Sequence, residues 1–158
     1  MLGIYIKTIR DFSRLLFLES AFDDFLLSEG RFVTSFTTDF DGSATAEDAE
    51  TPYIRWEQIR PLAFQLIKGK VPPKSFSLAL VCPAGKTKAL LAQGGEPADE
   101  DALPLLFLNI RYREEKLMLT TGVSEKTFRP HSGAGALWDR QVRRMLEELG
   151  LGDAISEP

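Results

Sequence analysis

The chain has 158 residues, of which 44% are hydrophobic, and these values suit one globular domain that buries its own core. A net charge of −4, with acidic residues concentrated in residues 39–50 and 96–101, disfavours nucleic acid as a partner. A single cysteine excludes an intrachain disulfide, and no apolar run reaches the ~18 residues that span a bilayer, so we expect a cytoplasmic protein without a membrane partner.

The N-terminal part of the chain predicts a strand, a short helix and a second strand. Residues 2–7 form the first strand, and Asp11 suits the N-cap of a helix of about two turns. From Asp24 onward the period changes to two, and Gly30 marks a bend or bulge. One face of this single long strand would carry Phe32, Thr34, Phe36, Thr38 and Phe40. Residues 42–51 have no apolar periodicity, so we expect a surface loop there.

The middle of the chain predicts a helix, a central strand and another helix. Apolar residues recur at helical spacing from Trp56 to Ile67, with Pro61 starting or kinking that helix. The strand that follows has the inward set Phe76, Leu78, Leu80 and Cys82. Its opposite set is Ser75, Ser77, Ala79 and Val81, and such small residues are expected of a central strand covered on both sides. A short helix over residues 85–93 and a second acidic loop over residues 94–103 complete this part.

Residues 106–124 alternate in polarity on both sides of a charged centre, and this pattern predicts one β-hairpin. Pairing Tyr112 with Leu117 turns one face inward, and its members are Leu106, Leu108, Ile110, Tyr112, Leu117, Leu119, Thr121 and Val123. Glu114 and Glu115 resist the positive φ angles of a type I′ turn, so a four-residue loop is expected. The outward face carries the residues that we predict to bind a partner, namely Phe107, Asn109, Arg111, Arg113, Met118 and Thr120.

A final helix is predicted from the stripe Trp138, Val142, Met145 and Leu149, with Gly150 as its C-terminal cap. This stripe would also suit a helix partner in a homodimer, although packing on the chain's own sheet is favoured. We therefore expect a single α+β domain over residues 1–150, in which three or four helices pack on a mostly antiparallel sheet. Residues 151–158 are expected to form a frayed tail.

The residue types needed for catalysis occur in unsuitable settings. Residues 85–87, Gly-Lys-Thr, resemble the end of a phosphate-binding loop, but the required first glycine is replaced by Leu80. His131 lies in a Pro/Ser/Gly-rich connection without a GxSxG-type nucleophile, and Cys82 points into the core. Three groups of carboxylates lie in polar turns, where we expect them to keep nearly ordinary pKa values. They are Asp23 with Asp24, Asp39 with Asp41, and Asp99, Glu100 and Asp101. We therefore predict no catalytic residue, no cofactor and no metal site, which disfavours an enzyme.

The outward face of the hairpin is the best candidate for function. Arg111 and Arg113 share it with Phe107 and Met118, a mixture that suits an anionic or peptide-like partner. We therefore predict a protein-binding or assembly module, with a protein partner or self-association. A plain solvent-facing sheet is one alternative. The other is a protein that binds a small molecule or a phosphorylated ligand between this face and the connection from Lys68 to Lys74, with weak hydrolysis by His131.

Two segments carry a resemblance to a known family, namely WEQIRPLAFQLIKGK at Trp56–Lys70 and LFLNIRYREEKLMLTTGVSEKTF at Leu106–Phe128. They resemble an uncharacterised bacterial domain-of-unknown-function family, and the similarity covers nearly the whole chain. Its members are small single-domain proteins that open with a short strand and helix, carry an Ile-Lys-Gly-Lys segment and close with a Trp-Asp helix, as at Trp138-Asp139. The resemblance implies no assigned activity, and therefore no catalytic residue, cofactor or substrate. At the hairpin turn this family has a small residue and a glycine where this chain has two glutamates, which leaves the turn type open.

Overall fold

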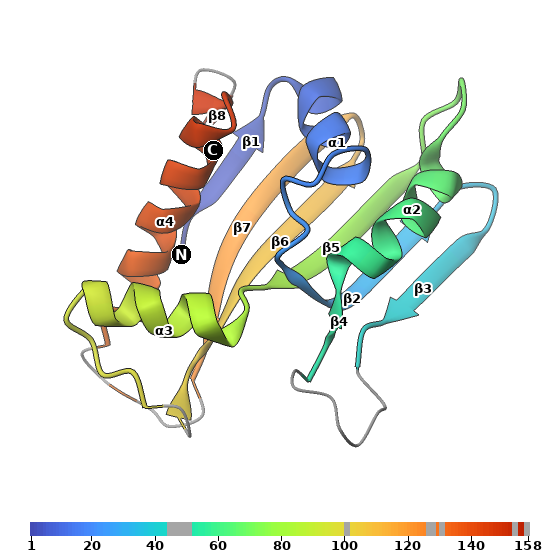
Figure 1. The fold of residues 1–158 in the computed structure, drawn as a ribbon. Helices are drawn as coiled ribbons and strands as arrows, with labels where there is room; N and C mark the ends of the chain where they lie inside the picture. Colours follow the sequence, from blue (N-terminus) through green and yellow to red (C-terminus); the bar gives the residue numbers. More distant parts are fainter. Residues whose placement is uncertain (44–51, 100–101, 126–128, 130–131, 153–154, 157–158) are drawn as a thin grey trace.

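The computed structural model describes residues 1–43, 52–99, 102–125, 129, 132–152 and 155–156. Its helices are α1 (Ile9–Phe17), α2 (Trp56–Ile67), α3 (Ala84–Gln93) and α4 (Ala134–Glu148). Its strands are β1 (Gly3–Ile6), β2 (Leu26–Val33), β3 (Thr37–Asp41), β4 (Ile54–Arg55), β5 (Ser75–Val81), β6 (Leu105–Arg113), β7 (Lys116–Ser124) and β8 (Ile155–Ser156). Figure 1 shows these elements in the colours of the sequence.

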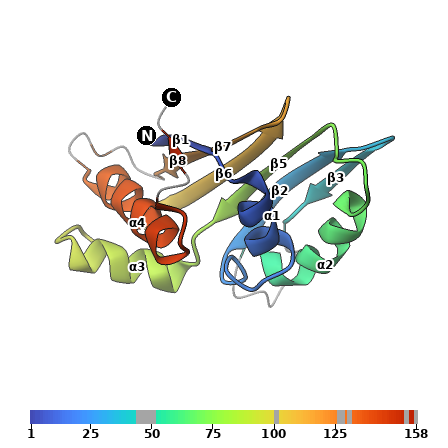
Figure 2. The same cartoon turned by 90° about the horizontal axis from the view of Figure 1, so that it is seen from above.

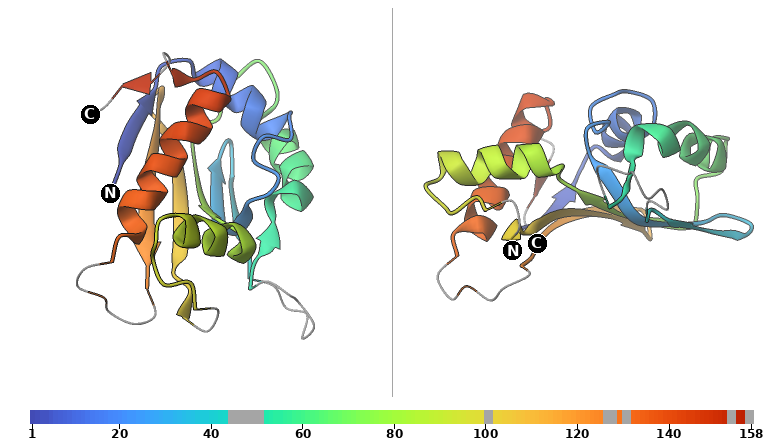
Figure 3. Two further views of the ribbon diagram at one scale, coloured as in Figure 1. Left: turned by 60° about the vertical axis from the view of Figure 1, so that its left-hand side comes forward. Right: turned by 60° about the horizontal axis from the view of Figure 1, so that its bottom comes forward.

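The strands form one antiparallel sheet in the order β3-β2-β5-β6-β7-β1-β8, with β4 paired to one end of β2. Helices α1 to α4 lie on one side of this sheet, as Figures 2 and 3 show from two further directions. The predicted α+β class with a mostly antiparallel sheet is therefore confirmed. The opposite side of the sheet, which we call the open face, is the side that the helices leave uncovered.

The core fills the layer between the sheet and the helices and is rich in aromatic rings. Phe76 of β5 stacks between Phe32 of β2 and Tyr112 of β6, with ring centroids 5.7 Å and 5.4 Å apart. Phe17 of α1 meets Phe76 edge-on at 5.4 Å, a favoured geometry for aromatic pairs. The indole of Trp56 is fully buried and donates its N–H to the carbonyl oxygen of Leu16 at 3.1 Å. The aromatic layer thus holds α1 and α2 against the centre of the sheet.

The single long strand predicted after Asp24 is wrong, because the chain turns back and forms β2 and β3. Residues of the two strands pair from Glu29 with Asp41 to Val33 with Thr37. Pairing with β3 provides hydrogen-bond partners for backbone N–H and C=O groups along the edge of β2, which would otherwise be unpaired. Phe32 and Phe40 still share a face and meet at 5.8 Å, whereas Phe36 lies at the turn with 62% of its surface exposed. The register shifts between Leu27 and Glu29, immediately before Gly30, where a bulge was expected.

The start of α1 and the segment after α4 differ from the prediction. Helix α1 begins at Ile9 with Thr8 at the N-cap, so Asp11 lies within the first turn, where its charge complements the helix dipole. At the other end of the chain, Gly150 has a φ of 80° and follows α4, as expected of a cap. The N–H of Leu151 then reaches back to the carbonyl oxygen of Leu146 at 2.8 Å, and both side chains are buried. Leu151 is therefore core, and β8 pairs with β1, so the tail is not frayed at these residues.

The hairpin of β6 and β7 has the predicted pairing, with Tyr112 opposite Leu117, Phe107 opposite Gly122 and Asn109 opposite Thr120. Its turn is shorter than predicted. Arg113 pairs with Lys116, and the two residues between them have positive φ angles, 54° at Glu114 and 61° at Glu115. This is the two-residue type I′ geometry. Nine residue pairs fix the register of the hairpin and leave two residues for the turn. The glutamates therefore adopt a backbone conformation that L-residues do not favour.

Candidate binding surface

Cross-strand neighbours on the open face form two rows. One row runs through Asp39, Arg31, Ser77, Arg111 and Met118, from β3 to β7. The next row runs through Asp41, Glu29, Ala79, Asn109 and Thr120. Because side chains alternate along a strand, these residues point away from the helices, opposite to buried neighbours such as Leu78 and Ile110. Five strands thus contribute polar side chains to one continuous surface.

A hollow of about 630 Å³ lies on this surface, and we call it the β5 trough. Its floor is β5, where Ser77 and Ala79 carry small side chains. One wall comes from β2 and β3 and consists of Glu29, Arg31 and Asp39. The other wall comes from the hairpin and consists of Asn109, Arg111, Met118 and Thr120. The trough is hollow because small residues in the middle strand stand between longer side chains on both sides.

The wall from β2 and β3 consists of an ion pair between Arg31 and Asp39 and of the additional carboxylate of Glu29. Arg31 donates from Nε to Oδ1 of Asp39 at 2.7 Å and from Nη2 to Oδ2 at 3.3 Å. The hydrogen bond and the negative charge of Asp39 raise the pKa of Arg31 above its ordinary value. Glu29 is exposed and makes no ion pair with any described residue. This wall therefore presents an acidic group to a ligand.

The hairpin wall carries the opposite charge. Arg111 is exposed, and within the described part of the chain its guanidinium has no ionic partner. Met118 is directly opposite Arg111 on β7 and is half-buried. A cation beside an apolar side chain at the edge of a hollow can bind a group that combines a carboxylate with an apolar part.

Four of the six residues predicted to bind line the trough, namely Asn109, Arg111, Met118 and Thr120. The other two lie on the same face beyond its ends. Phe107 pairs with Gly122, and Arg113 lies beside the turn, where its Nε is 3.8 Å from the carboxylate of exposed Glu114. The lysines of the connection between α2 and β5, which the alternative prediction placed beside this face, are not among the lining residues of the trough.

Sequence reasoning missed the wall formed by β2 and β3. Glu29 and Arg31 alternate with buried Gly30 and Phe32, and this alternation was the available signal. A single long strand over these residues does not bring Asp39 opposite Arg31, and the predicted surface therefore lacks this wall. The prediction that β5 is covered on both sides is wrong. The strand is central, but its small residues form the floor of a trough and are not covered by a second layer.

The remaining chemical candidates have structural partners or lie elsewhere. Asp23 receives two hydrogen bonds from Arg60, and Asp24 receives one from Lys86 of α3 at 2.7 Å, which lowers the pKa of Asp24. Leu80 lies within β5, as expected. His131 lies outside the described residues. Among the residues that are described, no three His, Cys, Asp or Glu side chains gather as a metal site would require, and no helix is long and apolar enough to cross a membrane.

The fold and this surface define an α+β domain with helices on one face of an antiparallel sheet and a charged hollow on the other. The model of a family of unknown function, DUF5721, matches residues 15–151, so the chain belongs to that family. No curated protein and no solved structure matches the chain.

Proposed function

We propose that this protein is a protein-binding module whose β5 trough receives a segment of a partner that carries both an acidic and an apolar side chain. The observation that carries the proposal is the position of Arg111. Its guanidinium is exposed at the wall of the trough, beside half-buried Met118, and it has no ionic partner among the described residues. A partner carboxylate could accept two parallel hydrogen bonds from it. Arginine and methionine are also enriched in protein interfaces.

A second copy of the chain is the other candidate occupant, because the two walls of the trough differ in charge. A twofold rotation would bring the acidic wall of one copy against Arg111 of the other. Two hollow surfaces leave a void between them, however, and a void forfeits packing contacts. A convex segment of a different partner fits the shape better.

We also propose a cytoplasmic location, which the single cysteine supports, since an unpaired thiol suits a reducing compartment.

The test is a selection of random peptides displayed on phage, with the wild-type protein as target and the double variant Arg111→Glu/Arg113→Glu for counter-selection. We expect the enriched peptides to contain Asp or Glu together with an apolar residue. Each should bind the double variant at least about tenfold more weakly, a change of ~1.4 kcal/mol. Peptides that bind both proteins equally would contradict the proposal.

The matched control is Arg140→Glu, which makes the same charge change on an exposed residue of α4 on the other side of the sheet. Peptide binding should be unchanged in Arg140→Glu.

Light scattering over a tenfold range of protein concentration shows whether the occupant of the trough is a second copy of the chain. In that case the wild-type mass would double, and the double variant would return to the monomer.

A further inference from the structure

A second hollow lies on the helical side of the sheet, far from the β5 trough in the fold. It has a volume of about 340 Å³ and lies between α3, α4 and the segment that leads into β2. We call it the α3–α4 cleft. Small-molecule sites in proteins typically have volumes of about 300 Å³ or more, and the space between helices is one of their usual locations.

The lining of the cleft is mainly apolar. Phe25 and Trp138 contribute aromatic rings whose centroids are 6.3 Å apart, and Leu90 and Met145 contribute aliphatic side chains from α3 and α4. The indole N–H of Trp138 is already engaged, since it donates to the carbonyl oxygen of Phe107 at 2.8 Å. These rings therefore offer a ligand apolar contact and no hydrogen bond from the indole.

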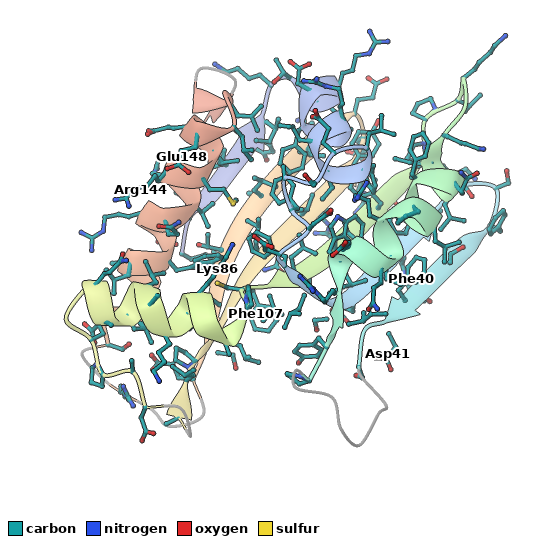
Figure 4. The ribbon with its side chains drawn as sticks, in the orientation of Figure 1. Phe40, Asp41, Lys86, Phe107, Arg144 and Glu148 are labelled. Atoms are coloured by element: carbon teal, nitrogen blue, oxygen red, sulfur yellow. The ribbon has the colours of Figure 1, made fainter. Side chains whose placement is uncertain are left out.

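Charged groups gather at the rim, and one of them is uncompensated. Lys86 of α3 and Asp24 neutralise each other through a hydrogen bond of 2.7 Å. Glu148 of α4 also lines the cleft, and it makes no ion pair with any described residue. Arg144 precedes it by one helical turn on α4, and Figure 4 labels both residues together with Lys86 on α3. The rim thus has one carboxylate without an ion-pair partner among the described residues, accompanied by the neutral amides of Gln93 and Gln141.

We propose that the α3–α4 cleft binds a small amine that carries an apolar ring or chain. The apolar part would lie against Phe25, Trp138 and Met145. The ammonium group would donate hydrogen bonds to the carboxylate of Glu148 and to the amide oxygens at the rim. A carboxylate of the same shape would meet Glu148 as a like charge. The charge at the rim therefore selects the amine.

The single cysteine of the chain supplies an independent reporter of occupancy. Cys82 lines the same cleft and retains 8% of its surface exposed. Because Cys82 lines the cleft, a ligand bound there should slow alkylation of its sulfur by iodoacetamide. Because the chain contains one cysteine, the mass of the intact protein measures this reaction at one site.

The experiment compares 2-phenylethylamine with 3-phenylpropionate, which are similar in shape and opposite in charge. Dissociation constants are measured from chemical-shift titrations, and the alkylation rate of Cys82 is measured in the same samples. The amine is expected to bind at least about fivefold more tightly than the acid, a ratio of the size that an exposed ion pair provides. It should also slow alkylation in proportion to its occupancy.

Two variants locate the site, and a third serves as control. Glu148→Gln should weaken amine binding by about two- to fivefold. Ala89→Trp, which places a large ring at an exposed position of the lining, should abolish binding. Glu147→Gln removes a charge from the adjacent residue of α4, which does not line the cleft, and should leave the affinity unchanged. Equal binding of amine and acid, binding that fails to protect Cys82, or no binding of the amine would each overturn the proposal.

Discussion

The indole Nε1 of Trp138 donates a hydrogen bond of 2.8 Å to the carbonyl oxygen of Phe107. This bond ties α4 to β6, the strand whose opposite face forms a wall of the β5 trough. Trp138 is 2% exposed, so nearly all of its ring is removed from water and its N–H is satisfied within the protein. Burial of an indole requires such a partner, because an unpaired N–H in the core would cost free energy. The position of α4 therefore depends on a polar contact within an apolar layer.

Trp138→Phe should lower the free energy of unfolding by about 1–3 kcal/mol, because it removes the donor and leaves the carbonyl of Phe107 without this partner. Lost volume in the core contributes in the same direction. Denaturation in urea, followed by circular dichroism, measures the change. A loss below about 0.5 kcal/mol, which is typical of surface substitutions, would show that the bond contributes little.

Replacing the two turn glutamates should stabilise the protein. Glu114 and Glu115 have φ angles of 54° and 61°, a left-handed conformation that costs L-residues ~1–2 kcal/mol each. Glu114→Asn/Glu115→Gly supplies the pair preferred in a type I′ turn, so we expect a gain of about 1 kcal/mol or more in the free energy of unfolding. The control Glu114→Ala/Glu115→Ala removes the same charges but keeps the backbone cost. If it stabilises the protein equally, the gain comes from charge.

The hairpin could be predicted from sequence because its two strands are adjacent in the chain. Alternating polarity fixed which residues face inward, and the pairing of Tyr112 with Leu117 followed. The turn could not be predicted from Glu114 and Glu115 alone, because their local preference opposes the geometry that the strand pairing imposes. Here tertiary pairing outweighs a local cost of a few kcal/mol.

The β5 trough could be predicted only in part, for a similar reason. Its hairpin wall was apparent from the polar positions of residues 106–124. The opposite wall depends on β2 and β3 folding back on each other and then pairing with β5, which places Arg31 beside Ser77 although 45 residues separate them in the sequence. No local period contains that information. The small residues of β5 are apparent in the sequence, but whether they form the floor of a hollow depends on whether a second layer covers them.

Among the ion pairs of the described residues, the pair of Arg60 and Asp23 has the least exposed side chains. We expect this pair to stabilise the fold. The guanidinium donates from Nε and Nη2 at 2.8 Å and 3.0 Å, and the two side chains are 21% and 14% exposed. Arg60→Ala should lower the free energy of unfolding by about 1.5–3 kcal/mol, as is typical for hydrogen bonds to charged groups. Arg60→Lys should recover little of this loss, because lysine cannot reproduce the two parallel bonds.

The matched control for this pair is Arg55→Ala. The guanidinium of Arg55 is 3.9 Å from the carboxylate of Glu57, and both side chains are more than half exposed. Exposed pairs contribute about 0–1 kcal/mol, so this variant should be almost as stable as the wild type. Similar losses in Arg55→Ala and Arg60→Ala would indicate that removal of the arginine stem, and not the paired geometry, sets the stability.

Burial of Cys82 should make the stability of the protein depend on pH in the alkaline range. Burial raises the pKa of the Cys82 thiol above its ordinary value of 9.0, although the nearby Thr87 side chain and the charge of Lys86 oppose the shift. The thiol in the unfolded chain therefore loses its proton at a lower pH than the thiol in the folded protein. Its contribution to stability is complete below pH 9.0 and is lost as the pH rises from 9.0 through the higher pKa of the folded state.

Other groups titrate in the same range, so the measurement needs a variant without the thiol. Unfolding in urea between pH 8 and pH 11 should show a steeper loss of stability in the wild type than in Cys82→Ala. The rate of alkylation by iodoacetamide should also reach half its maximum at a higher pH in the folded protein than in urea. Parallel stability curves for the two proteins would mean that the thiol has the same pKa in the folded and unfolded states.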